Sequence, residues 1–170
     1  MGHLEKGLQA TRERIDAAAR AAGRDPAAVR LLAVSKTFPA AAVAAAWAAG
    51  QRCFGENFVQ EAVAKIEALA GLQDIEWHLI GPLQSNKAKL AAERFDWVQS
   101  VDRDKIARAL SAARPPDRPP LSVCIQVNGS GEATKAGVRP GEARALAAAV
   151  AALPRLRLRG IMGIPEPTTD

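Results

Sequence analysis

Short runs of β-branched and other apolar residues alternate with longer, alanine-rich stretches of helical period along most of the 170-residue sequence. This alternation is typical of βα units, in which helices join neighbouring parallel strands and pack on the sheet. It predicts an α/β fold in which the carboxyl ends of all the strands lie along one edge.

Six such units can be placed, and an additional helix over residues 4–22 precedes them, ending at Gly23. The proline-rich segment 114–120 is predicted to be an internal loop, because the same alternation resumes directly after it. The expected strands are 31–35, 52–55, 75–80, 97–100, 121–127 and 156–162, and the expected helices between them are 40–49, 58–70, 87–94, 103–112 and 141–152.

Six parallel strands can form an open doubly wound sheet or part of a (β/α)8 barrel, and 170 residues is fewer than the ~200 of most complete barrels. No strand is followed by G-x-G-x-x-G or by G-x-x-x-x-G-K-[ST]. Their absence disfavours dinucleotide-binding and P-loop folds but leaves both architectures open.

The composition indicates one globular domain over residues 1–170, because 48% of the residues are hydrophobic and none of the apolar runs is long enough to span a membrane. The amino terminus lacks a secretory signal pattern, so we expect a cytoplasmic protein. Cys53 and Cys124 form no CxxC pair and are expected to be buried, reduced thiols. With only His3 and His78 available, a histidine-rich metal site is excluded.

The formal net charge of +5 would permit nucleic-acid binding, but the basic residues are dispersed among acidic ones and form no stripe. Aromatic residues make up 4% of the chain and do not interleave with basic ones, which disfavours a stacking platform for single strands. We therefore expect neither a nucleic-acid nor a membrane partner.

Lys36 closes the first apolar run, where a buried parallel strand should reach the functional edge of the sheet. An amine partly removed from water loses stabilisation of its charged form, and the neutral amine is nucleophilic towards an aldehyde. Lys36 is therefore a candidate Schiff-base lysine, although a lysine that simply points into water fits the same position.

The remaining strand endings are also rich in polar groups and occur in a fixed order. The chain contains AVSKT, FGEN-x-VQE, WH-x-IG-x-LQSNK, SVDR, IQVN-x-S-x-E-x-TK-x-G and LRG-x-M-x-IP-x-P. In this order and spacing the motifs resemble the pyridoxal phosphate homeostasis proteins over essentially the whole chain.

The resemblance implies a (β/α)8 TIM-barrel fold like that of the alanine racemase N-terminal domain, with about six βα units present here. It also implies that pyridoxal 5′-phosphate (PLP) forms a Schiff base with Lys36. Members of that family are regarded as cofactor carriers that buffer PLP and deliver it to other proteins, such as PLP-dependent apoenzymes. The chain is then not a conventional enzyme.

Several other residues have both a cofactor role and a structural one. The Asn57 amide could reach the pyridine ring or cap the following helix with Gln60, and His78 could be a hydrogen-bonded core residue. Ser85 and Asn86 could meet an anion at a helix start or cap that helix, and Met162 could line the pocket or pack in the core. The expected cofactor-binding residues are Lys36, Asn57, His78, Ser85, Asn86 and Met162; Lys135 is left out as a solvated loop lysine.

Compared with the family it resembles, the chain lacks two final strands, whose loops supply much of the phosphate site in such barrels. We therefore expect weak PLP binding, since charge-assisted phosphate hydrogen bonds contribute about 1.5–3 kcal/mol each. The first and last strands would be open edges, which favours self-association. A truncated product and one half of a split protein are further interpretations.

Two alternative functions remain open at this stage. A lysine-dependent racemase or a Schiff-base aldolase would use Lys36 with a second acid-base group. A racemase of this fold uses a tyrosine opposite the lysine, and this chain has no tyrosine. An interaction protein without any ligand would not explain why the motifs cluster at the strand ends.

Overall fold

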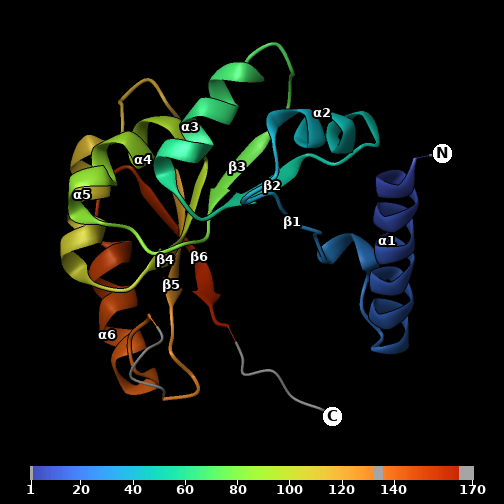
Figure 1. Cartoon of the computed structure of the whole chain (residues 1–170). Coiled ribbons are helices and arrows are strands. Elements are labelled where there is room, and N and C mark those ends of the chain that lie inside the picture. Colours follow the sequence, from blue (N-terminus) through green and yellow to red (C-terminus); the bar gives the residue numbers. More distant parts are fainter. Residues whose placement is uncertain (1, 132–135, 165–170) are drawn as a thin grey trace.

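The computed structural model describes residues 2–131 and 136–164, which form one parallel sheet in the order β1-β2-β3-β4-β5-β6 (Figure 1). The order in the sheet follows the order in the sequence, so each strand pairs with the next one along the chain. The strands are β1 (Ala33–Val34), β2 (Cys53–Glu56), β3 (Glu76–Leu79), β4 (Trp97–Val101), β5 (Leu121–Gln126) and β6 (Leu156–Met162).

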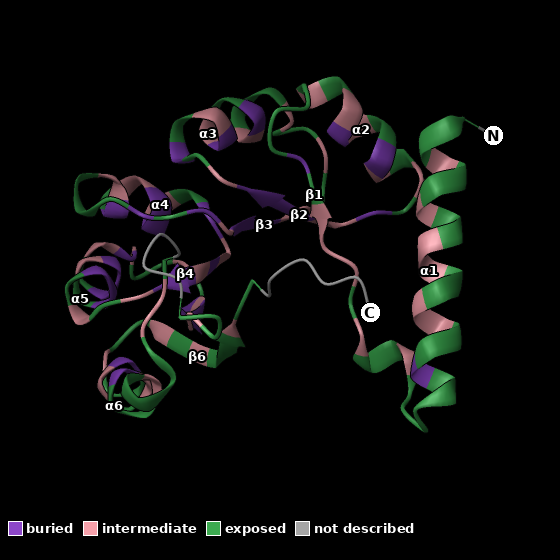
Figure 2. Cartoon of the chain, turned by 60° about the horizontal axis from the view of Figure 1, so that its bottom comes forward, coloured by how far each residue is buried: buried purple, intermediate pink, exposed green. Residues whose placement is uncertain are grey.

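Five helices follow the first five strands and cover the outer side of the curved sheet (Figure 2). The helix α1 (His3–Ala21) stands beside α2 at the β1 end of the sheet, and Arg12 joins the two by donating to the Ala49 carbonyl at 3.2 Å. The covering helices are α2 (Ala40–Ala48), α3 (Val59–Ala68), α4 (Ala88–Arg94), α5 (Asp104–Ala113) and α6 (Pro140–Ala151); short 3-10 turns span Pro26–Ala28 and Ser85–Lys87.

The hydrophobic core lies between the strands and these helices. Alternate strand residues point to opposite faces, so one apolar set along each strand packs under the helices. Buried residues of this core include Phe54, Trp77, Leu79, Val98, Val123 and Ile125 from the strands and Val43, Ala62, Ala91, Ile106 and Leu110 from the helices. The other face carries polar side chains such as His78 and Gln99, which hydrogen bond to each other.

The proline-rich segment 114–120 is an internal loop, as predicted, because β5 pairs with β4 directly after it. Arg114 is buried at its start and makes hydrogen bonds that hold the loop. Its guanidinium donates to the Ala92 and Phe95 carbonyls, each at 2.7 Å, and to the Pro119 carbonyl at 2.8 Å.

The predicted elements are confirmed, with ends that differ by one or two residues. The largest difference is β1, which spans two residues instead of five, although Ser35 N–H still donates to the Gly55 carbonyl. The interpretation of Asn57 as a helix cap is wrong, because Phe58 occupies the cap position of α3 and makes no side-chain capping bond.

Within the described ranges, none of the helices combines the length and apolar character needed to cross a membrane. Lys135 and the final residues 165–170 lie outside the described ranges.

Candidate functional site

A cavity of about 490 Å³ lies at the carboxyl ends of the strands. That volume falls within the ~300–1,000 Å³ of typical small-molecule sites. All six strand segments contribute to it, five of them with residues at their carboxyl ends and β4 with Gln99 from its middle. The lining residues are Leu32, Lys36, Asn57, Ile80, Gly81, Pro82, Gln99, Gln126, Val127, Asn128, Ala136, Met162 and Ile164.

Lys36 follows β1 and lines this cavity with an exposed side chain. The exposed side chain fits the alternative in which Lys36 points into water, and its role as a Schiff-base lysine stays a prediction. Its place at the cavity is the predicted one, because Ser35 remains buried and bonded to β2 while the chain leaves the sheet at Lys36.

Asn57 also lines the cavity, directly after β2, and Gly81 brings a second stretch of backbone against it. A Cβ atom placed on Gly81 would lie 2.3 Å from the Asn57 carbonyl oxygen and 2.7 Å from the Asn57 Cα. Only glycine leaves room for this approach. The Gly81 segment therefore supports the backbone of Asn57 at the edge of the cavity.

Met162 lies at the end of β6 and forms part of the apolar wall with Ile80 and Val127. Sequence reasoning assigned no role to two amides that also line the cavity, Gln99 and Gln126. Gln126 stands in the strand ending that carries the IQVN motif and was detectable there. The only signal for Gln99 is its position in β4, where Gln99 and Ser100 are polar residues in an otherwise apolar strand.

The structure does not bring Ser85 and Asn86 to this cavity. Both side chains are exposed in the 3-10 turn before α4, and neither lines a described hollow near Lys36. Gln84 occupies the cap position of the 3-10 turn and Lys87 that of α4, and neither makes a side-chain capping bond. The prediction that Ser85 or Asn86 caps the helix is therefore wrong.

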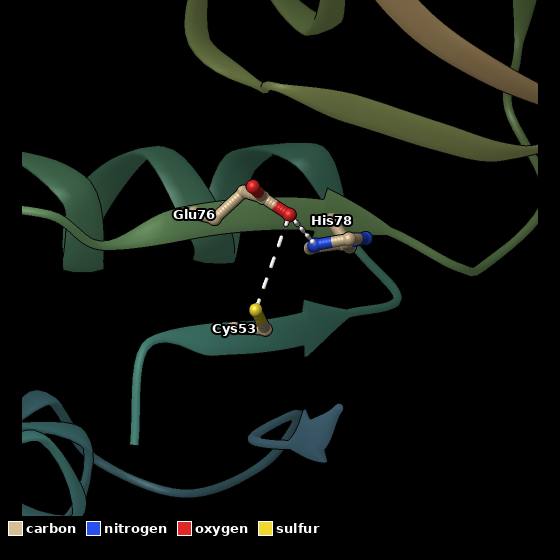
Figure 3. Close-up of side chains that lie close together, drawn as sticks. All are labelled: Cys53, Glu76 and His78. Atoms are coloured by element: carbon tan, nitrogen blue, oxygen red, sulfur yellow. Dashed lines mark hydrogen bonds and ion pairs between the residues drawn. The ribbon is translucent and has the colours of Figure 1, made fainter. Parts of the chain in front are cut away.

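His78 lies outside the cavity wall and is a hydrogen-bonded, buried histidine. Its Nε2 lies 2.8 Å from Glu76 Oε1, its Nδ1 lies 2.9 Å from Gln99 Nε2, and its ring stacks on Trp97 (Figure 3 shows the Glu76 bond). A carboxylate can only accept, so Nε2 donates to Glu76 and Nδ1 accepts from Gln99. His78 therefore reaches the cavity only through the Gln99 amide.

Cys53, Glu76 and His78 point toward one another, and one potential metal-binding atom of each lies within 4.8 Å of the others (Figure 3). Cys53 is half-buried, contrary to the predicted burial. Arg30 already holds this cluster, because its guanidinium donates to Cys53 Sγ at 2.7 Å and to Glu76. The guanidinium thus already uses the Cys53 and Glu76 atoms that would bind a metal ion, and with His78 these residues form a hydrogen-bonded ion-pair cluster.

The charges of this cluster follow from its surroundings. Burial lowers the pKa of His78, although the nearby Glu76 charge opposes that shift, so the imidazole is neutral at pH 7. Burial alone would raise the pKa of Glu76, but the hydrogen bonds and charges of Arg30 and His78 together outweigh burial and lower the pKa. Glu76 is therefore ionised, which suits the tautomer assigned to His78.

A second hollow, of about 430 Å³, lies between α1 and the amino ends of β1 and β2. Its arginines are bonded to the protein itself: Arg12 to Gln51, Arg30 to Glu76 and Arg52 to the Trp47 carbonyl. The arginine side chains of this hollow are thus already hydrogen bonded within the protein, and the hollow lies away from the carboxyl ends of the strands. The cavity at Lys36 is the better candidate site.

The Lys36 cavity suits a flat ring with polar substituents and an aldehyde. Apolar walls lie beside amide groups, and one primary amine stands at the edge. Lys36 carries the only formal charge among the described lining residues, so when its amine reacts with the aldehyde these residues offer a phosphate group amide donors but no further cation.

Comparisons with known proteins agree with this geometry. The sequence pattern of the alanine racemase N-terminal domain family matches residues 7–167. A pyridoxal phosphate homeostasis protein of Pseudomonas aeruginosa is 58% identical over 170 residues, which cover all of this chain and 74% of that protein.

Solved structures show the same relationship. PipY of Synechococcus elongatus PCC7942, solved with PLP bound, is 41% identical with a TM-score of 0.75, over 91% of this chain and 72% of PipY. Alanine racemase from E. faecalis is 22% identical with a TM-score of 0.65, over 91% of this chain and 41% of the racemase, which shows a shared fold. The six parallel strands and the helices between them are thus a partial TIM-barrel α/β fold, as predicted, and the chain belongs to the pyridoxal phosphate homeostasis protein family, which carries the alanine racemase N-terminal domain.

Proposed function

We propose that this chain binds PLP in the cavity at Lys36 and acts in intracellular PLP homeostasis as a cofactor carrier or buffer. One observation carries the proposal: the Lys36 amine stands at a cavity built by the strand ends, in a chain 41% identical to a protein solved with PLP bound.

The chemistry needed is the condensation of the Lys36 amine with the PLP aldehyde, which forms one C=N bond and releases one water molecule. The amides of Asn57, Gln99 and Gln126 are placed to bind polar substituents of a ring, and Met162 and Ile80 to contact its face. With Lys36 the only cation among the described lining residues, we expect weak retention of the phosphate group by these residues.

The same cavity favours carriage over catalysis. Racemase or aldolase chemistry needs a second acid-base group close to the lysine. Lys36 is the only lining residue in the described ranges with a side chain that can act as an acid or a base. We therefore propose that the chain is not a conventional enzyme.

A visible-absorbance titration of the folded chain with PLP tests this proposal. We expect a yellow Schiff-base band that saturates in the wild type and in Lys89→Ala, a control at an exposed lysine, and is absent in Lys36→Ala. A band that survives in Lys36→Ala at equal strength would refute Lys36 as the site. Amino-acid racemisation that depends on Lys36 would favour the enzyme alternative instead.

We propose further that PLP-dependent apoenzymes receive the cofactor, and that the protein works in the cytoplasm, where free thiols such as Cys53 and Cys124 persist.

Self-association is also proposed. In the described sheet, β1 and β6 each pair on one side only, and Val34 and Ile161 on these two edge strands are 48% and 73% exposed. Light scattering across a concentration series tests the last point: a constant monomer mass would refute it.

A further inference from the structure

A buried group of charged side chains lies under the segment that carries Lys36. Glu56, the last residue of β2, is fully buried, and Lys65 from α3 reaches it with a side chain that is 7% exposed. Lys65 Nζ lies 2.9 Å and 3.0 Å from the two carboxylate oxygens of Glu56 and 2.8 Å from Glu61 Oε1.

This network bonds to the residue on each side of Lys36. On the amino-terminal side, Lys65 Nζ donates to the Ser35 carbonyl at 2.8 Å, and the Ser35 hydroxyl donates to Glu56 at 2.6 Å. On the carboxyl-terminal side, Thr37 N–H donates to Glu61 Oε1 at 3.0 Å. The backbone is therefore held immediately before and immediately after the lysine.

The segment needs this support for two reasons. The strand β1 has only two residues and pairs only with β2 among the described strands, so the sheet holds little of it. Thr37 also has a φ of 68°, a left-handed conformation that is costly for a β-branched residue. Such backbone persists only where the surrounding contacts determine it, and here they are the Glu61 and Lys65 bonds.

Lys65 and Glu61 remain charged around neutral pH. Burial alone would lower the pKa of Lys65, but its bonds to Glu61 and Glu56 outweigh burial and raise it. The hydrogen bond from Lys65 lowers the pKa of Glu61. A buried ion pair can often be replaced by apolar residues without loss of protein stability. Apolar side chains at these positions, however, could not donate to the Ser35 carbonyl or accept from the Thr37 N–H.

We infer that Glu56, Lys65 and Glu61 are positioning residues for Lys36, which fix the backbone on both sides so that its side chain enters the cavity. This inference rests on the proposed function, in which Lys36 is the amine that reacts.

The variant Glu61→Ala tests it with little disturbance of the core, since the Glu61 side chain is 35% exposed. Glu67→Ala is the matched control, because Glu67 lies on the same helix, is 58% exposed and pairs with Arg94. Glu61→Gln restores an acceptor for Thr37 N–H without the charge and should therefore recover most of the wild-type behaviour.

Two measurements are compared across these variants. Amide exchange at Thr37 should become about fivefold faster in Glu61→Ala, as expected for the loss of one hydrogen bond. Labelling with limiting PLP and borohydride, followed by peptide mass mapping, gives the ratio of adduct at Lys36 to adduct at Lys89. That ratio should fall about tenfold in Glu61→Ala and stay unchanged in Glu67→Ala.

The outcomes separate this inference from the proposed function. No preference for Lys36 over Lys89 in the wild type would refute the proposed function, and the inference with it. A wild-type preference that Glu61→Ala leaves intact would refute the inference alone, whether or not exchange at Thr37 changes. A fall in the ratio that Glu61→Gln reverses, at similar melting temperatures, would support it.

Discussion

Replacing Gly81 by alanine should damage the edge of the Lys36 cavity through the backbone of Asn57. The added Cβ would lie 2.3 Å from the Asn57 carbonyl oxygen, 2.7 Å from its Cα and 2.8 Å from its carbonyl carbon. All three atoms are backbone atoms, so no side-chain rotation can relieve the contact.

The magnitude follows from this geometry. Carbon atoms in proteins pack at about 3.5 Å or more, so the two backbone segments must separate by roughly 1 Å. Overpacking of this kind costs typically about 1–3 kcal/mol, and the upper end is expected because backbone must move. A displacement of that size at Asn57 should also weaken PLP binding by at least about tenfold.

Urea denaturation and PLP titration of Gly81→Ala measure both effects. Gly7→Ala is the matched control, because Gly7 lies inside α1 and a Cβ there would meet nothing within 4 Å. That control should be more stable than the wild type by about 0.5–1 kcal/mol and should bind PLP normally. A Gly81→Ala protein within about 0.5 kcal/mol of the wild type would show that the close approach is not a real constraint.

Three further predictions concern stability. The pKa of His78 is lowered in the folded state, so the unfolded chain binds the proton more readily and the free energy of unfolding should fall from pH 7 to pH 5. In urea denaturation, the midpoint of His78→Asn should fall less over this pH range than that of the wild type, and equal falls would contradict this. Lys65→Met leaves Glu56 buried without its cation and should cost about 3–5 kcal/mol in urea unfolding, with a loss under about 1 kcal/mol as the contrary result. Arg114→Ala removes donors from three carbonyls and should cost at least about 2 kcal/mol, whereas Arg108→Ala, at an exposed ion pair, should cost under about 1 kcal/mol; equal losses would refute the role of Arg114.

The fold and the position of the site could be predicted from the sequence because both depend on the βα alternation. Parallel strands place their carboxyl ends along one edge, so Lys36, Asn57 and Met162 were expected together, and the structure places all three at one cavity. The order of the motifs at these strand ends also predicted the family, and the family model matches residues 7–167.

The individual contacts could not be predicted in the same way. Alternation indicates which face Gln99 and His78 share, but not that Gln99 lies between His78 and the cavity. The exposure of Lys36 depends on what covers the edge of the sheet, which a local pattern does not report. Ser85 and Asn86 looked like a helix start because they lie in a 3-10 turn that directly precedes α4, and such turns are frequent at the ends of α-helices.

The central claim is that Lys36 is the amine that binds PLP, and chemical trapping tests it most directly. The folded wild-type chain is incubated with less than one equivalent of PLP, reduced with borohydride and digested, and the modified lysines are identified by mass spectrometry. We expect the adduct to be concentrated on the peptide containing Lys36, at an edge of the cavity lined by Asn57 and Met162. Adduct spread evenly over exposed lysines such as Lys89 would contradict it.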